Sequence, residues 1–255
     1  MRIIISPAKK MNVDTDSLPW RDLPAFLPQT EVLLQQLKNM DDISLKKLWN
    51  CNDKIVSLNI QRLKDMDLRR NLTPAILAYE GLQYQYMAPS VFSESEYAYI
   101  QEHLRILSGF YGLLCPFDGV TPYRLEMQAK LRHANGNDLY SYWNSHLAEK
   151  LAQETTCIIN LASKEYSLCV SKHLSPEIRF ITCVFGEEQN GKVIEKGTMC
   201  KMARGEMVRY MAEQQVHDPE EIKQFQRLDY SFDAAKSTED TFVFVRKGAQ
   251  ECSLD

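Results

Sequence analysis

The segment IIISPAKKMN, residues 3–12, begins as an apolar run and ends in a turn that carries two lysines. Three consecutive isoleucines predict a short buried strand over residues 2–5, which ends at Pro7. Polar residues that directly follow a buried strand commonly line the mouth of a pocket. Ser6 therefore offers a hydroxyl, and Lys9 a cation, to an anionic ligand. The alternative is a solvated turn whose lysines keep an edge strand soluble.

The composition is that of an ordinary globular domain. The chain has 255 residues, of which 44% are hydrophobic and 25% charged, and its formal net charge is −4. This charge argues against a protein that coats nucleic acid through bulk charge, although it allows a local basic cleft. The apolar runs are too short for a membrane span or a signal peptide, and seven cysteines without a CxxC pair are typical of reduced thiols. We expect a cytoplasmic protein with no membrane partner.

Strand-like and helix-like segments alternate irregularly along the chain. Strands are predicted at residues 2–5, 157–161, 178–185, 192–195 and 241–246, with a hairpin turn at the Asn-Gly pair 190–191. Helices are predicted at residues 30–40, 45–52, 55–66, 93–104, 138–153 and 201–214, and after Pro74. No repeat or linker divides the chain. We expect one compact α/β domain of the mixed α+β kind, residues 1–255, in which helices surround a mixed sheet.

The segment PYRLEM, residues 122–127, places an arginine and a glutamate two positions apart. In an extended segment, Arg124 and Glu126 point to the same side. Arg124 then clamps an anion, and Glu126 serves as a general base or orients a ligand. The alternative is a buried ion pair, because guanidinium and carboxylate match in a bidentate fork.

The segment NLASKEY, residues 160–166, directly follows a predicted strand. Asn160, Ser163 and Tyr166 are therefore expected to cluster at the carboxyl end of that strand, where ligands commonly bind in α/β proteins. In the alternative interpretation, Ser163 or Asn160 only caps the following helix.

A third group of polar residues lies in KMARGEMVRY, residues 201–210. Helical spacing places Lys201 and Arg204 on one face, with Arg209 rotated partly away. These cations are candidates for holding phosphate groups. The alternative is an amphipathic helix with its methionines inward and its cations in water.

The sequence does not predict a metal site or a cofactor. Its five histidines are scattered, and the one close pairing, His146 with Glu149, lies on an otherwise polar predicted helix. There is no GxSxG element, and no cysteine lies in a nucleophile signature. These residues do not establish catalysis; the candidates for it are Lys9, Glu126 and Lys201.

Taken together, five motifs carry a resemblance that spans nearly the whole chain. ISPAK, LRILSGFYGLL, PYRLEM, NLASKEY and KMARGEMVRY occur in this order, and the chain is similar to the YaaA family of peroxide stress proteins. The resemblance implies a cytoplasmic bacterial protein that helps cells survive hydrogen peroxide by limiting unincorporated iron. It also implies a single compact α/β fold with a helix-hairpin-helix element and an association with DNA. No established reaction accompanies the family name.

The implied helix-hairpin-helix element is placed at residues 44–66. Its hairpin frame, hydrophobic-x-Gly-hydrophobic-Gly, exposes backbone N–H groups to DNA phosphate. IVSLNIQR, residues 55–62, matches this frame if Ser57 and Asn59 replace the glycines. Arg62 and Lys64 are then candidates for further phosphate contacts.

Three hypotheses follow from the residues and the resemblance. In the first, a cationic cleft formed by Ser6, Lys9, Arg124, Asn160, Ser163, Lys201, Arg204 and Arg209 binds DNA with low sequence specificity. In the second, the same cleft belongs to an enzyme that acts on a small anionic or nucleotide-like substrate. The third, direct sequestration of iron, is disfavoured by the absence of metal-ligand spacing.

Overall fold

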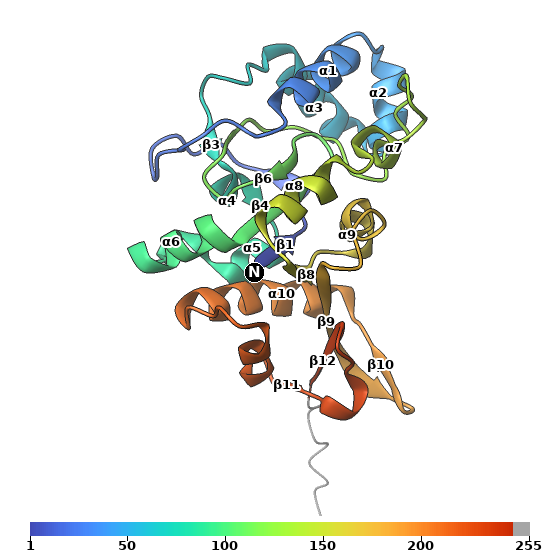
Figure 1. The fold of residues 1–255 in the computed structure, drawn as a ribbon. Coiled ribbons are helices and arrows are strands. Elements are labelled where there is room, and N and C mark those ends of the chain that lie inside the picture. The colour runs from blue at the N-terminus through green and yellow to red at the C-terminus, as the bar shows by residue number, and fades with distance from the viewer. Residues whose placement is uncertain (247–255) are drawn as a thin grey trace, which may run out of the picture.

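The computed structural model describes residues 1–246, and within them eight strands form one mixed sheet (Figure 1). These strands are β1 (Arg2–Ile5), β5 (Leu104–Ser108), β6 (Gly112–Leu114), β8 (Cys157–Leu161), β9 (Arg179–Gln189), β10 (Lys192–Ile194), β11 (Tyr230–Phe232) and β12 (Thr241–Arg246). Their order is β11-β12-β9-β8-β1-β5-β6, and β10 pairs with β9. Two small ladders pair β2 (Lys10–Met11) with β4 (Tyr79–Glu80), and β3 (Thr73–Pro74) with β7 (Gly119–Val120).

Helices surround this sheet, as the composition and patterning predict. They are α1 (Leu27–Lys38), α2 (Asp42–Trp49), α3 (Asp53–Asp65), α4 (Ala75–Ala78), α5 (Leu82–Met87), α6 (Glu94–His103), α7 (Leu139–Trp143), α8 (His146–Glu154), α9 (Lys164–Ser171) and α10 (Gly197–Glu213), with short 3₁₀ turns at Pro89–Val91, Pro219–Gln224 and Ala234–Lys236. Helices α1, α2 and α3 lie at one end of the molecule, and β10, β11 and β12 lie at the other (Figure 1). None of the helices in residues 1–246 has the length and apolarity that a membrane crossing requires.

Strand β1 occupies the centre of the sheet, where it pairs in parallel with both β5 and β8. Its three isoleucines are fully buried, which explains the unbroken apolar run. The parallel strands follow one another in the chain as β1, β5, β8, β9 and β12, but in space they are ordered β5-β1-β8-β9-β12. The chain therefore runs from β1 to β5 on one side of β1, and then returns to β8 on its other side. The crevice at the carboxyl ends of β1 and β8 is a topological switch point, which is the usual ligand position in an open α/β sheet.

Most predicted elements are confirmed, with shifted ends. The hairpin turn has positive φ at Asn190 and Gly191, 51° and 75°, as an Asn-Gly turn requires. The predicted helix at residues 138–153 is divided into α7 and α8, because Asn144 has a positive φ of 42° that ends α7. The helix predicted to begin at Pro74 is shorter than expected, since Pro74 belongs to β3 and precedes the four-residue α4.

The predicted hairpin at residues 55–62 is wrong. These residues belong to the continuous helix α3, in which Ser57 Oγ donates to the Asp53 carbonyl oxygen and Asn59 Nδ2 donates to the Ile55 carbonyl oxygen. Neither side chain replaces a hairpin glycine, and the actual turn between α2 and α3 is at residues 50–52. The helix-hairpin-helix element is therefore not confirmed.

Of the two cations assigned to that element, Arg62 turns inward and Lys64 is exposed. The Arg62 guanidinium donates to the carbonyl oxygen of Met11 over 3.2 Å, so it ties α3 to the segment that follows β1. Lys64 lies on the exposed face of α3, near its carboxyl end.

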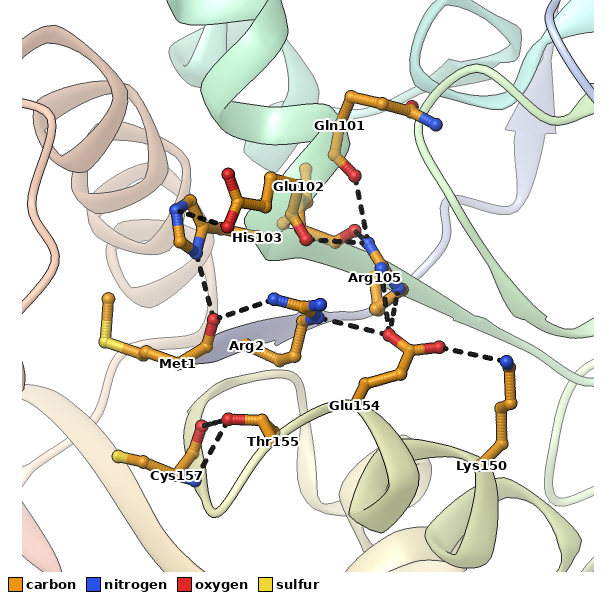
Figure 2. A network of polar contacts seen from close by, with 11 residues as sticks. Met1, Arg2, Gln101, Glu102, His103, Arg105, Lys150, Glu154, Thr155 and Cys157 are labelled. Carbon is orange, nitrogen blue, oxygen red and sulfur yellow. Dashed lines mark hydrogen bonds and ion pairs between the residues drawn. The ribbon is translucent and has the colours of Figure 1, made fainter.

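An ion cluster closes the amino end of β1 (Figure 2). The Glu154 carboxylate at the end of α8 accepts from Arg2 Nε at 3.1 Å and lies 2.8 Å from an Arg105 guanidinium nitrogen and 3.4 Å from Lys150 Nζ. Burial alone raises the pKa of Glu154, but the three cations outweigh burial and lower it below the ordinary value. The cluster ties β1, β5 and α8 together at the end of the sheet opposite the switch point.

Candidate functional site

A cavity of about 390 Å³ opens at the carboxyl ends of β1 and β8. It brings together segments that are far apart in the sequence: the turn after β1, α5, residues 123–126, the start of α9, and α10. The predicted site residues that line it are Ser6, Lys9, Arg124, Glu126, Ser163, Lys201 and Arg204. The side chains of four of the five motifs thus converge on one cavity.

Two serines join β1 to the start of α9 at the base of this cavity. The backbone N–H of Ser163 donates to Ser6 Oγ over 2.8 Å, and Ser6 Oγ donates in turn to Ser163 Oγ over 3.2 Å. Ser163 is the N-cap residue of α9, yet its side chain accepts no capping hydrogen bond from the helix. Its hydroxyl therefore faces the cavity together with the positive end of the α9 dipole.

Glu126 bridges two of the predicted cations. Its carboxylate lies 2.7 Å from Lys9 Nζ and 2.6 Å from a terminal nitrogen of Arg124. The Arg124 side chain is only 10% exposed, whereas that of Lys9 is 65% exposed. The buried Nε of Arg124 has no hydrogen-bond partner within residues 1–246. A buried arginine with an unused donor is prepared to accept a further anionic or polar partner.

Helix α10 contributes the remaining cations. Lys201 is exposed and forms no ion pair within residues 1–246, and Arg204 makes only a 3.4 Å contact with Glu195. The Nε of Arg204 is also buried without a partner in the described chain. Gly205 allows α10 to pack closely against α5, because a Cβ at that position would collide with the carbonyl oxygen of Gln83 on α5.

Two predicted residues lie outside the cavity lining. Asn160 is buried: its Oδ1 accepts from the Ala162 N–H at 3.0 Å, and its Nδ2 donates to Thr182 Oγ1 at 3.3 Å. It therefore shapes the turn after β8. Arg209 is paired with Glu213 one turn later on α10, at 2.7 Å.

Several lining residues were not predicted. They are Gln83 and Tyr84 on α5, Tyr123, and Glu165 on α9, whereas Tyr166 on α9 lines the cavity as the sequence predicts. Burial raises the pKa of Glu165, and the negative charge of the nearby Glu126 raises it further. A hydrogen bond from the backbone N–H of Gln128 opposes this shift. Glu165 lies inside the NLASKEY motif, but charged residues in the first turn of a helix are too common to indicate a site.

Comparison with protein families identifies the chain. Residues 1–236 match the family model described as "Peroxide stress protein YaaA". The chain belongs to the YaaA family of peroxide stress proteins. It is 54% identical over 246 residues to a UPF0246 protein of Lachnoclostridium phytofermentans, covering 96% of both chains. It is 53% identical over 247 residues to a UPF0246 protein of Agathobacter rectalis, covering 97% of this chain and 99% of that relative.

In this YaaA-family chain, the cavity has an excess of positive charge. Five cations line it, Lys9, Lys10, Arg124, Lys201 and Arg204, against three carboxylates, Glu80, Glu126 and Glu165. No group of histidine, cysteine or acidic side chains with metal-ligand geometry is present in residues 1–246. Hydroxyls, a helix N-terminus and surplus cations are together suited to holding an anion.

Proposed function

We propose that this YaaA-family protein binds a small anionic molecule in the cavity at the ends of β1 and β8. The observation that carries this proposal is the convergence of Ser6, Ser163, Arg124, Lys201 and Arg204 on one cavity at the switch point of the sheet. A volume of about 390 Å³ suits a small ligand rather than a duplex, since small-molecule pockets measure roughly 300–1,000 Å³.

Titration calorimetry with inorganic phosphate and pyrophosphate at low salt tests the proposal. We expect Arg204→Ala to weaken binding by about tenfold, the usual effect of one charge-assisted contact. Arg209→Ala is the matched control, because Arg209 lies on the same helix outside the cavity. Absence of binding at millimolar concentration, or an equal loss in both variants, would contradict the proposal.

The alternative within the same cavity is an enzyme that acts on the bound anion. Lys9, Glu126 and Lys201 all face the cavity, which supports keeping them as catalytic candidates. Lys9 Nζ lies 2.7 Å from the Glu126 carboxylate, and an ion-paired cation at the cavity is suited to stabilise negative charge on the bound anion. Conversion of a bound phosphate ester, lost in Lys201→Ala but not in Lys192→Ala on the exposed hairpin, would favour this alternative.

A second cavity supports DNA as a second candidate partner. It measures about 620 Å³, shares Lys9 and Arg124 with the first, and is bordered by the exposed Lys47 and Lys130. Exposed lysines around an opening are suited to phosphate backbones. We expect anisotropy titrations with duplex and junction DNA to show affinity that falls steeply with salt. Lys47→Ala should reduce the salt slope by about one, and Lys192→Ala should leave it unchanged.

We also propose that the protein limits unincorporated iron in cells exposed to peroxide. Its membership in a peroxide stress family supports this role, because ferrous iron converts hydrogen peroxide into hydroxyl radicals. Electron paramagnetic resonance of chelator-treated cells measures this iron pool. Cells that carry Arg204→Ala should resemble cells without the protein, whereas Arg209→Ala should restore the low iron signal. Equal iron signals with and without the protein would contradict the role.

A further inference from the structure

We infer that the anion bound in this cavity carries a heteroaromatic ring, so that the ligand belongs to the class of nucleoside monophosphates. The inference rests on the proposed function and adds the chemistry of the ligand's uncharged part. Three features of the lining carry it. Tyrosine rings and a buried glutamine amide are left unused by the anion alone, and the amount of surplus positive charge matches a phosphate monoester.

Three tyrosines, Tyr84, Tyr123 and Tyr166, line the cavity and are all buried. The hydroxyls of two of them are used inside the protein. Tyr84 donates to the carbonyl oxygen of Ser6 over 3.0 Å, and the Tyr123 hydroxyl lies 2.7 Å from Ser108 Oγ. Tyr84 and Tyr123 therefore offer ring carbon rather than polar atoms to the cavity. A phosphate or sulfate ion has no apolar surface to place there, whereas a planar ring packs well against aromatic side chains.

Gln83 lines the same cavity, and its side-chain amide has an unsatisfied donor in residues 1–246. The residue is 7% exposed, and its Nε2 is buried with no hydrogen-bond acceptor in residues 1–246. A buried donor left unsatisfied costs about 1–3 kcal/mol, which a ligand that supplies an acceptor recovers. The ring nitrogens and carbonyl oxygens of a nucleobase are acceptors of this kind, and a plain phenyl ring has none.

The charge of the cavity matches a phosphate monoester. Cations outnumber carboxylates by two in the lining, and a phosphate monoester carries close to two negative charges at neutral pH. The guanidinium groups of Arg124 and Arg204, whose Nε atoms have no partner in residues 1–246, line the cavity and are donors for its oxygens. Together, the lining has places for a dianion, a planar ring and a hydrogen-bond acceptor on that ring.

Calorimetry with the full chain and a matched set of probes tests each part separately. The probes are AMP, GMP, CMP and UMP, ribose 5-phosphate without the ring, adenosine without the anion, phenyl phosphate without the ring acceptor, and inorganic phosphate. We expect one nucleoside monophosphate to bind at least about tenfold more tightly than ribose 5-phosphate, adenosine and phenyl phosphate. Equal affinity for ribose 5-phosphate or phenyl phosphate overturns the inference but leaves the proposed function intact. Failure of every probe, inorganic phosphate included, overturns both.

Gln83→Leu provides an independent test, with Gln85→Leu on the exposed face of the same helix as its control. We expect Gln83→Leu to weaken the preferred nucleoside monophosphate by about tenfold and to leave phenyl phosphate binding unchanged, because only the amide contact is lost. An equal loss for both probes would mean that the substitution disturbs the cavity as a whole, and would overturn the assignment of Gln83. Retained phenyl phosphate binding also shows that the variant is folded.

Discussion

The backbone N–H of Ser163 donates a hydrogen bond to Ser6 Oγ over 2.8 Å, and this contact joins the ends of the two strands on either side of the switch point. Ser6→Ala removes the acceptor and leaves a partly buried N–H unsatisfied, so we expect the free energy of unfolding to fall by about 1–2 kcal/mol. Ser163→Ala keeps the N–H bond and removes only the hydroxyl, so it should cost less stability. Urea unfolding of both variants measures the difference, and equal losses would contradict this division of roles.

Glu126 occupies the cations that a ligand needs. Glu126→Gln releases Lys9 and Arg124 from their carboxylate partner, so we expect inorganic phosphate to bind more tightly, by about tenfold. The same substitution should destabilise the fold by about 1–3 kcal/mol, because it leaves the buried Arg124 without its charge partner. Glu80→Gln, which breaks the exposed pair with Lys10, should change stability by less than about 1 kcal/mol. Weaker phosphate binding in Glu126→Gln would contradict the expectation.

Asp118 makes the stability depend on pH. Burial, together with the nearby Asp22, raises the pKa of Asp118 to about 7, against an ordinary value of 3.8. The folded chain therefore holds this proton between pH 4 and 7 while the unfolded chain releases it, so stability falls as pH rises through that window. The slope due to Asp118 is at most about 1.4 kcal/mol per pH unit. We expect urea unfolding of Asp118→Asn to lack this part of the slope, and the exposed Asp16→Asn to retain it.

The ion cluster at the amino end of β1 should be essential for stability but not for binding. Glu154→Gln leaves Arg2 and the 8%-exposed Arg105 without a carboxylate, so we expect a loss of about 3–5 kcal/mol. Asp53→Asn breaks an exposed pair with Lys46 and should cost less than about 1 kcal/mol. Phosphate affinity measured below the melting temperature should be unchanged in both variants. A binding defect in Glu154→Gln would show that the two ends of β1 are coupled.

The low pKa of Glu154 also gives a direction for acid unfolding. Because the folded-state pKa lies below the ordinary value, the stability that this carboxylate contributes is complete above that value and is lost as pH falls through the folded-state pKa. Protonation of Glu154 should therefore add to the acid sensitivity of the unsubstituted chain. Glu154→Gln lacks this carboxylate, so acid should unfold it only as far as its lowered overall stability predicts. Acid titration followed by circular dichroism measures this.

The sequence indicates the elements that are locally encoded and misses those that depend on tertiary contacts. The apolar runs at residues 3–5 in β1 and 158–159 in β8 are buried on both faces of the sheet, and the Asn-Gly turn after β9 encodes its own geometry. The segment that forms β5 and β6 mixes glycine with aromatic residues, so its strand pairing is set by contacts with β1 rather than by local preference.

The same distinction applies to the site. Arg124 is predictable because it shares one side of an extended segment with Glu126, and Lys201 because it shares a helix face with Arg204. Gln83 and Tyr84 are not, since they lie on a short uncharged helix whose place beside α10 depends on Gly205. Asn160 is predicted in the cleft because it lies near the end of a strand, but its amide is used by the turn that follows.

The central position of β1 has a consequence for folding during synthesis. This strand leaves the ribosome before both of its partners, β5 and β8, and β8 ends only at residue 161. Its three buried isoleucines must therefore remain unpaired, or in temporary contacts, until β8 has been made. A nascent chain that stops before β8 has neither a complete parallel core nor the cavity at its edge, so the site forms late and only together with the sheet.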